Sequence, residues 1–179
     1  RKYLAYFPGE PDTANTNFLL AEILFESGQF DEATIEYERA AYEYPTHERS
    51  AEAAYAALLS YREHEQRLTN PADAEAKVAW HQRYLDSGLK FADTFPLHPE
   101  SGAVLTTVAE DLFAQNQFDL AIAVSQIIVD KQPPVKPELA RTAWTVIAHS
   151  QFDLSNFGAA EQSYYQLRSF TPPDDPEAN

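Results

Sequence analysis

Five histidines and 28 acidic residues are the side chains of this chain that could bind a metal ion or transfer a proton. The histidines are His47, His64, His81, His98 and His149, and no two have the His-Glu-x-x-His spacing that places two imidazoles and a carboxylate on one helical face. The absence of cysteine excludes thiolate metal sites and cysteine nucleophiles. We therefore expect no metal, no cofactor, and solvated or packing roles for the histidines.

The carboxylates are numerous but scattered, and no pair of them stands out as a general acid and base. The sequence has no glycine-rich phosphate loop, nucleophile elbow or dinucleotide-binding fingerprint, and its five glycines are too few to build several of them. We therefore predict that the chain is not an enzyme and that it acts by binding.

The charge of the chain limits what it can bind. Thirteen Lys and Arg stand against 28 Asp and Glu, a net charge of −15, which opposes binding to nucleic acid or to an anionic membrane surface. No apolar run approaches the roughly 20 residues that cross a bilayer, so we expect no direct membrane insertion by this segment. A basic or neutral protein or peptide is the easier partner, although the charge could also serve only solubility.

Prolines divide the sequence at regular intervals, each after a stretch with helical periodicity. Pro8 and Pro45 are 37 residues apart, Pro96 and Pro133 are again 37 apart, and Pro172 follows 39 residues later. The interval from Pro45 to Pro96 is 51 residues, 14 longer than the first. Because proline ends helices, these intervals predict a repeated helical unit, one copy of which carries an insertion.

Each interval has the pattern of two helices joined by a short turn. Gly28 interrupts the first pair where a left-handed residue would end a helix, and Asn116, the next most tolerant residue, lies near the same point in a later pair. The insertion is expected to lengthen both helices of its unit and their connecting loop. The predicted units are residues 14–47, 48–99 with the insertion, 102–135 and 141–174, after a truncated unit whose second helix is residues 1–10.

Four positions agree in three of these units. They are an aromatic residue in the turn (Phe30, Phe118, Phe157), small residues in both helices (Ala21, Ala33, Ala109, Ala121, Ala148, Ala160) and a closing proline (Pro45, Pro133, Pro172). In this register the units resemble the tetratricopeptide repeat, a helix–turn–helix unit of about 34 residues. The resemblance implies an all-α, right-handed superhelical solenoid of antiparallel helix pairs, forming one array over residues 1–179.

The resemblance also implies that the first helix of each unit lines a concave groove. The corresponding positions are Asn15, Phe18, Glu22, Phe25 and Glu26, then Ala103, Thr106, Glu110, Phe113 and Ala114, and finally Thr142, Thr145, His149, Phe152 and Asp153. The recurring aromatic rings either pack between helices or form the apolar floor of a peptide site, where the acidic residues would select positive charge. An acidic groove would repel a carboxylate. We therefore do not expect the chain to bind the terminal carboxylate of a chaperone, as co-chaperone members of the family do.

The function that these expectations favour is a protein–protein interaction scaffold that binds a peptide or partner protein in the groove. Two alternatives stay open: an architectural spacer within a larger envelope protein, or a regulatory module of an enzyme encoded elsewhere in the full chain. The opening "RKYLAYFPGEP" has no initiator Met, which suggests a segment of a longer protein. The proline breaks also resemble those of bacterial envelope tetratricopeptide proteins, the barrel-assembly lipoproteins and cell-division coordinators, implying the periplasm or cell envelope of a Gram-negative bacterium.

Overall fold

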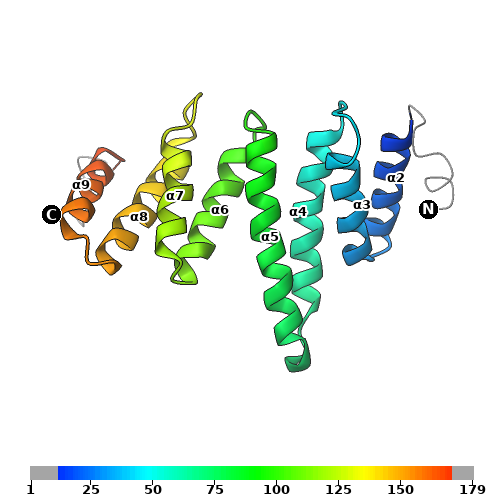
Figure 1. Ribbon diagram of the computed structural model, residues 1–179, viewed down its shortest axis with the longest axis horizontal. Coiled ribbons are helices and arrows are strands. Elements are labelled where there is room, and N and C mark those ends of the chain that lie inside the picture. The colour runs from blue at the N-terminus through cyan, green and yellow to red at the C-terminus, as the bar shows by residue number, and fades with distance from the viewer. Residues whose placement is uncertain (1–11, 171–179) are drawn as a thin grey trace. The chain divides into compact units, whose positions relative to one another are not determined.

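The computed structural model describes residues 12–170, and every regular element in that range is a helix (Figure 1). This confirms the predicted all-α class. The predicted helix at residues 1–10 and the end of the last predicted unit lie outside the described residues. The α-helices are α2 (Thr13–Glu26), α3 (Phe30–Tyr42), α4 (Ser50–Arg67), α5 (Ala74–Thr94), α6 (Ser101–Ala114), α7 (Phe118–Val129), α8 (Pro137–Asp153) and α9 (Phe157–Leu167), with short 3-10 turns η1 (Pro71–Asp73) and η2 (Arg168–Phe170).

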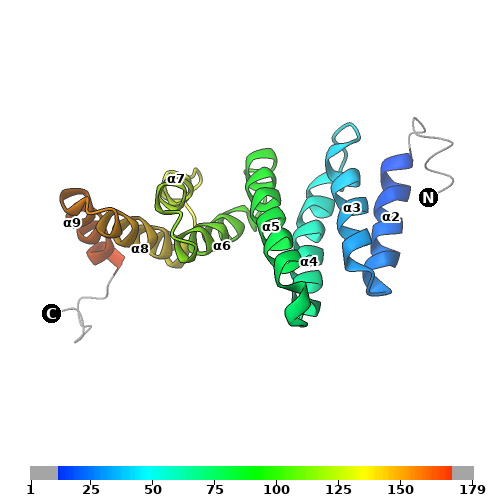
Figure 2. The ribbon, with the colours of Figure 1, turned by 60° about the horizontal axis from the view of Figure 1, so that its bottom comes forward.

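The chain divides into two compact units, Arg1–Pro96 and Leu97–Asn179. In unit 1, α3 packs against both α2 and α4, and α5 packs against α4. In unit 2, α7 packs against both α6 and α8, α9 packs against α8, and α6 also contacts α8. Within each unit consecutive helices run in opposite directions, as two views of the ribbon show (Figures 1 and 2). Each helix thus buries its apolar side mainly against its neighbours in sequence.

Three of the helix pairs, α2–α3, α6–α7 and α8–α9, are joined by the same turn. Its central residue is left-handed in each case: Gly28 has φ 75°, Asn116 has φ 59° and Ser155 has φ 61°. The N–H of this residue donates to the carbonyl three residues earlier and the next N–H to the carbonyl five residues before it, at 2.7–2.9 Å. These bonds satisfy carbonyls that a helix end leaves unpaired. The left-handed turns expected from Gly28 and Asn116 are confirmed, whereas Ser155 gave no such signal.

Small residues occupy matching buried positions in the paired helices. The six alanines that share the repeat register are all buried: Ala21, Ala33, Ala109, Ala121, Ala148 and Ala160. A methyl side chain lets two helix backbones approach, because no longer side chain has to be placed between them. In each of the three pairs, one alanine of the first helix and one of the second are twelve residues apart and flank the same kind of turn. The three pairs therefore share this local arrangement.

The additional residues of the second predicted unit lengthen α4 and α5. These helices have 18 and 21 residues, against 14 and 13 for α2 and α3. Asn70 separates them: its side-chain oxygen accepts the Ala72 N–H at 2.9 Å at the start of η1. In the lengthened part the Trp80 ring packs between Tyr61 and His64, with ring centroids 5.3 and 4.3 Å away.

Glu38 connects three helices of unit 1. Its Oε1 accepts hydrogen bonds from the hydroxyls of Tyr61 on α4, at 3.2 Å, and of Ser87 on α5, at 2.7 Å. Tyr61 and Ser87 are both buried. Loss of the Glu38 carboxylate would therefore leave two buried hydroxyl groups without this hydrogen-bond acceptor. This one side chain on α3 therefore holds α5 in register, although Ser87 lies 49 residues away in sequence.

Replacing Ser155 by glycine should stabilise unit 2 by about 0.5–1 kcal/mol, because a left-handed residue with a Cβ is strained and glycine is not. The measurement is the free energy of unfolding from urea titration followed by circular dichroism. Gln115→Gly is the matched control, since Gln115 has φ −84° and glycine there relieves no left-handed strain. Equal effects of the two substitutions would contradict the prediction.

Replacing Tyr42 by phenylalanine should protect the fold at high pH. Burial, and then the charge of Glu38, raise the pKa of Tyr42 far above its usual value, and its buried hydroxyl has no hydrogen-bond partner among the described residues. Above about pH 10 the unfolded chain loses this proton and the folded chain keeps it, so the wild type loses stability. The variant should equal or exceed the wild type at neutral pH and lose less at about pH 11.

Urea titrations at both pH values check this prediction, with Tyr165→Phe at an exposed position as the control. A Tyr42→Phe variant that loses as much stability as the wild type between the two pH values would contradict it.

Candidate functional site

Phe18, a predicted groove residue of α2, belongs to the core of unit 1. Its side chain is 1% exposed, and its ring meets Tyr37 edge to face with centroids 5.5 Å apart. The Arg49 guanidinium lies 3.5 Å from the ring centroid, so a cation covers the face that a ligand would need. Phe18 thus stabilises the packing of α2 and offers no surface to a partner.

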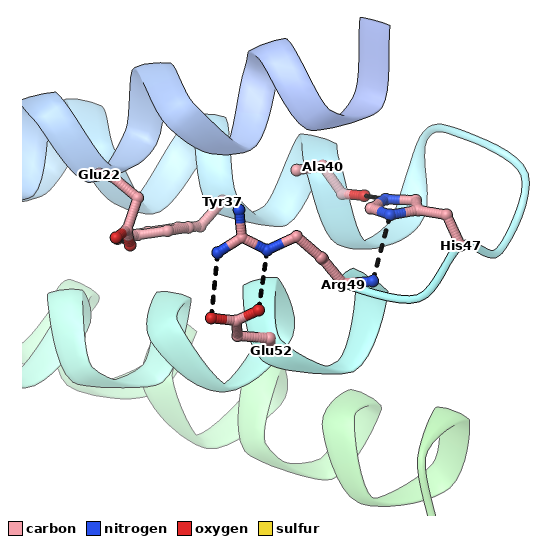
Figure 3. A network of polar contacts seen from close by, with 6 residues as sticks. All are labelled: Glu22, Tyr37, Ala40, His47, Arg49 and Glu52. Carbon is pink, nitrogen blue, oxygen red and sulfur yellow. Dashed lines mark hydrogen bonds and ion pairs between the residues drawn. The ribbon is translucent and has the colours of Figure 1, made fainter. Parts of the chain in front are cut away.

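Glu22, the acidic residue next along the same predicted surface, also has an internal partner. The Tyr37 hydroxyl donates to its carboxylate, and burial followed by this hydrogen bond raises the pKa of Tyr37 well above the usual range. Arg49 in turn donates through Nε and Nη2 to Glu52, at 2.9 and 3.1 Å, which lowers the pKa of Glu52 (Figure 3). The carboxylates of Glu22 and Glu52 therefore already accept hydrogen bonds within the chain.

Two histidines fix the loops between helix pairs. The Nε2 of His47 donates to the Ala40 carbonyl at 2.9 Å while its Nδ1 accepts the Arg49 N–H at 3.3 Å (Figure 3). These two bonds require a neutral ring with the proton on Nε2. His98 has the same place before α6, where its Nδ1 accepts the Glu100 N–H at 3.2 Å. Both rings order the backbone before the next helix, as the packing role expected for them requires.

The remaining predicted groove residues of α2 differ in their surroundings. Phe25 packs against Phe30 and Tyr37, with centroids 5.0 and 6.4 Å away. The Asn15 side chain donates to Asp12 within its own helix end at 3.3 Å, and Glu26 is exposed. In unit 1 the recurring ring thus has the packing role, which was one of the two alternatives for it.

In unit 2 the structure brings together predicted groove residues from two helices. Phe113 of α6 and His149 of α8 meet edge to face with centroids 6.2 Å apart, and His149 also contacts Tyr164 of α9 at 5.7 Å. Phe152 lies one helical turn beyond His149 on α8 and is 54% exposed. We define the unit 2 aromatic face as Glu110, Phe113, His149, Phe152 and Tyr164.

Other predicted residues of unit 2 add little to this face. Thr106 is buried and its hydroxyl donates to the Gly102 carbonyl at 2.9 Å, while the Thr145 hydroxyl donates to Arg141 in the same way. Asp153 is exposed at the end of α8. Tyr164 was missed by sequence reasoning because it lies on a second helix, and only first-helix positions were considered.

Glu110 supplies the charge of the unit 2 aromatic face. Partial burial, with a smaller contribution from the negative charge of Asp111, raises the pKa of the Glu110 carboxyl. A carboxylate that is partly removed from water gains more from a nearby cation than a fully solvated one does. The face therefore combines exposed aromatic rings with an acidic group suited to a positively charged ligand.

Among the described residues, no group of three or more acidic or histidine side chains could hold a metal ion. None of the helices in residues 12–170 combines the length and apolarity of a membrane span. No protein-family model matches the chain, and no curated protein matches it.

Replacing Glu110 by glutamine should stabilise unit 2 more at neutral pH than in acid. Because the folded-state pKa is raised, ionisation of Glu110 opposes folding, and this cost appears as the pH rises through the raised pKa. Urea titrations of both proteins at about pH 4 and about pH 7 measure the difference. Glu75→Gln at an exposed position of α5 is the control; the same pH dependence in both variants would contradict the prediction.

Proposed function

We propose that this chain is an array of tetratricopeptide-like helix hairpins, a right-handed superhelical solenoid, that acts as a protein-interaction scaffold. The proposal is supported by three hairpins with the same left-handed turn and the same hydrogen bonds. It is also supported by the buried alanines at matching positions of the paired helices. In such an array each hairpin presents its first helix to a ligand, so the unit 2 aromatic face is where a peptide would lie.

The observation that carries the proposed function is the contact of Phe113, His149 and Tyr164 across three helices, with Glu110 one helical turn before Phe113 on α6. Exposed aromatic rings provide apolar contact area at a low cost in side-chain entropy, and a carboxylate beside them favours basic side chains. A basic or neutral peptide fits this combination, which also agrees with the charge of the whole chain. Chemistry on the peptide is not part of the proposal.

Unit 1 favours a second candidate, an architectural spacer. Phe18 is covered by Arg49, Glu22 accepts from Tyr37, and Arg49 is paired with Glu52. A helix pair whose polar groups are satisfied internally holds its neighbours in place without needing a ligand. We therefore assign ligand binding to unit 2 and a supporting role to unit 1. A bacterial cell envelope location and a regulatory role beside an enzyme remain hypotheses from the family resemblance.

Selection from a random heptapeptide library displayed on phage, with the whole chain as bait, tests the binding proposal. We expect enrichment of peptides with Lys or Arg next to apolar residues. Glu110→Lys should weaken binding of the selected peptides about tenfold or more, because it places a like charge against the ligand. Glu75→Lys is the matched control, with the same change in net charge at an exposed position in unit 1.

Two results would contradict this function. One is a selection that enriches no peptide over the bare support. The other is an equal effect of Glu110→Lys and Glu75→Lys on peptide affinity, which would indicate attraction to the net charge alone.

A further inference from the structure

The turn between α2 and α3 already binds an arginine of the same chain. The Nη1 of Arg67, at the end of α4, donates to the carbonyl of Gly28 at 2.8 Å. The same guanidinium lies over the Phe30 ring, 4.3 Å from its centroid, and Phe30 in turn packs against Phe25. A Cβ built on Gly28 would be only 2.9 Å from Arg67 Nη1, so the guanidinium rests directly on the turn. The Phe30 side chain is 7% exposed.

The turn between α8 and α9 has the same left-handed residue and aromatic pair, but no arginine among the described residues is bound to it. Ser155 has the left-handed φ and the same backbone hydrogen bonds as Gly28, and Phe152 and Phe157 pair at 5.3 Å as Phe25 and Phe30 do at 5.0 Å. Phe157 is 59% exposed. Within residues 12–170, no side chain donates to the Ser155 carbonyl and no cation lies over the Phe157 ring.

The turn between α6 and α7 is a different case. Asn116 has the same backbone conformation, but its aromatic pair, Phe113 and Phe118, is approached by the His149 ring on the Phe113 side. A neighbouring helix therefore supplies a covering group in two of the three turns. Only at Ser155 are both rings of the pair more than half exposed.

We propose that the turn at Ser155 is a binding site for an arginine side chain of a partner peptide. The guanidinium would donate to the Ser155 carbonyl and lie on the Phe157 ring, as Arg67 does on Gly28 and Phe30. Arginine suits this site better than lysine, because a planar guanidinium can stack on a ring and donate at its edge together. Asp153, an exposed carboxylate two residues before Ser155, adds favourable charge.

Ser155 differs from Gly28 in having a Cβ, which changes the expected pose slightly. The guanidinium must move outward from the position that Arg67 adopts, and the flexible end of an arginine side chain permits this. The Ser155 hydroxyl can accept a second N–H in the shifted pose. Ser155→Gly, which recreates the first turn, should therefore retain arginine binding. The inference rests on the proposed function, because it specifies one residue of the basic peptide that unit 2 would bind.

Nuclear magnetic resonance of the ¹⁵N-labelled whole chain, titrated with N-acetyl-arginine amide at millimolar concentrations, tests the proposal. We expect saturable shifts of the backbone amides of Ser155, Asn156 and Phe157. N-acetyl-citrulline amide, which is neutral but similar in shape, should not reproduce them. Phe157→Leu should weaken the arginine response about two- to fivefold, the effect of losing one cation–π contact.

Arg67→Ala provides an internal positive control, because it vacates the first turn. In this variant the amides of Gly28, Gln29 and Phe30 should gain an arginine-dependent shift that the wild type lacks. The proposal is overturned if these amides respond while residues 155–157 do not, if neither turn responds, or if citrulline matches arginine. Failure of the proposed function looks different: selected peptides would then be insensitive to Glu110→Lys while the Ser155 turn still binds arginine amide.

Discussion

The turn at the end of each first helix is the constraint on which the three repeated helix pairs depend. A left-handed residue at Gly28, Asn116 or Ser155 reverses the chain, and two hydrogen bonds then fix where the second helix begins. This start places the turn phenylalanine against the ring that ends the first helix, and it brings the buried alanines of the two helices together. The packing of each pair is therefore decided within a few residues of its turn.

The predicted groove positions have different surroundings in unit 1 and unit 2, although the helix pairs share the same turn. In unit 1 the predicted groove residues of α2 other than the exposed Glu26 make contacts within the chain, and Arg49, the residue before α4, covers Phe18 and pairs with Glu52. In unit 2 no cation has this role among the described residues, and His149 meets Phe113 as a ring instead. The cation beside Phe18 and the imidazole beside Phe113 thus distinguish the two surfaces.

Sequence reasoning gave the helical class, the left-handed turns at Gly28 and Asn116 and the alanine register, since all three depend on residues close in sequence. Burial of Phe18 could not be read in this way, because its cover lies 31 residues away and needs the packing of α2 beside α4. Ser155 carried no signal because serine rarely adopts the left-handed region, and here the surrounding bonds impose it. Tyr164 was missed because the resemblance directed attention to first helices only. The lengthening of α4 and α5 followed from proline spacing, although the role of Glu38 between them did not.

The local closure of the turns also determines how the chain folds and opens. Their hydrogen bonds join residues only three and five positions apart, so a hairpin can form before any distant contact exists, and little loop entropy opposes it. Glu38 is different, since it joins residues 49 positions apart and can form its bond to Ser87 only after α4 and α5 have paired. We therefore expect the α2–α3 hairpin of unit 1 to form before the hydrogen bond between Glu38 and Ser87. We consequently expect amide exchange to be slowest in the three helices that Glu38 joins.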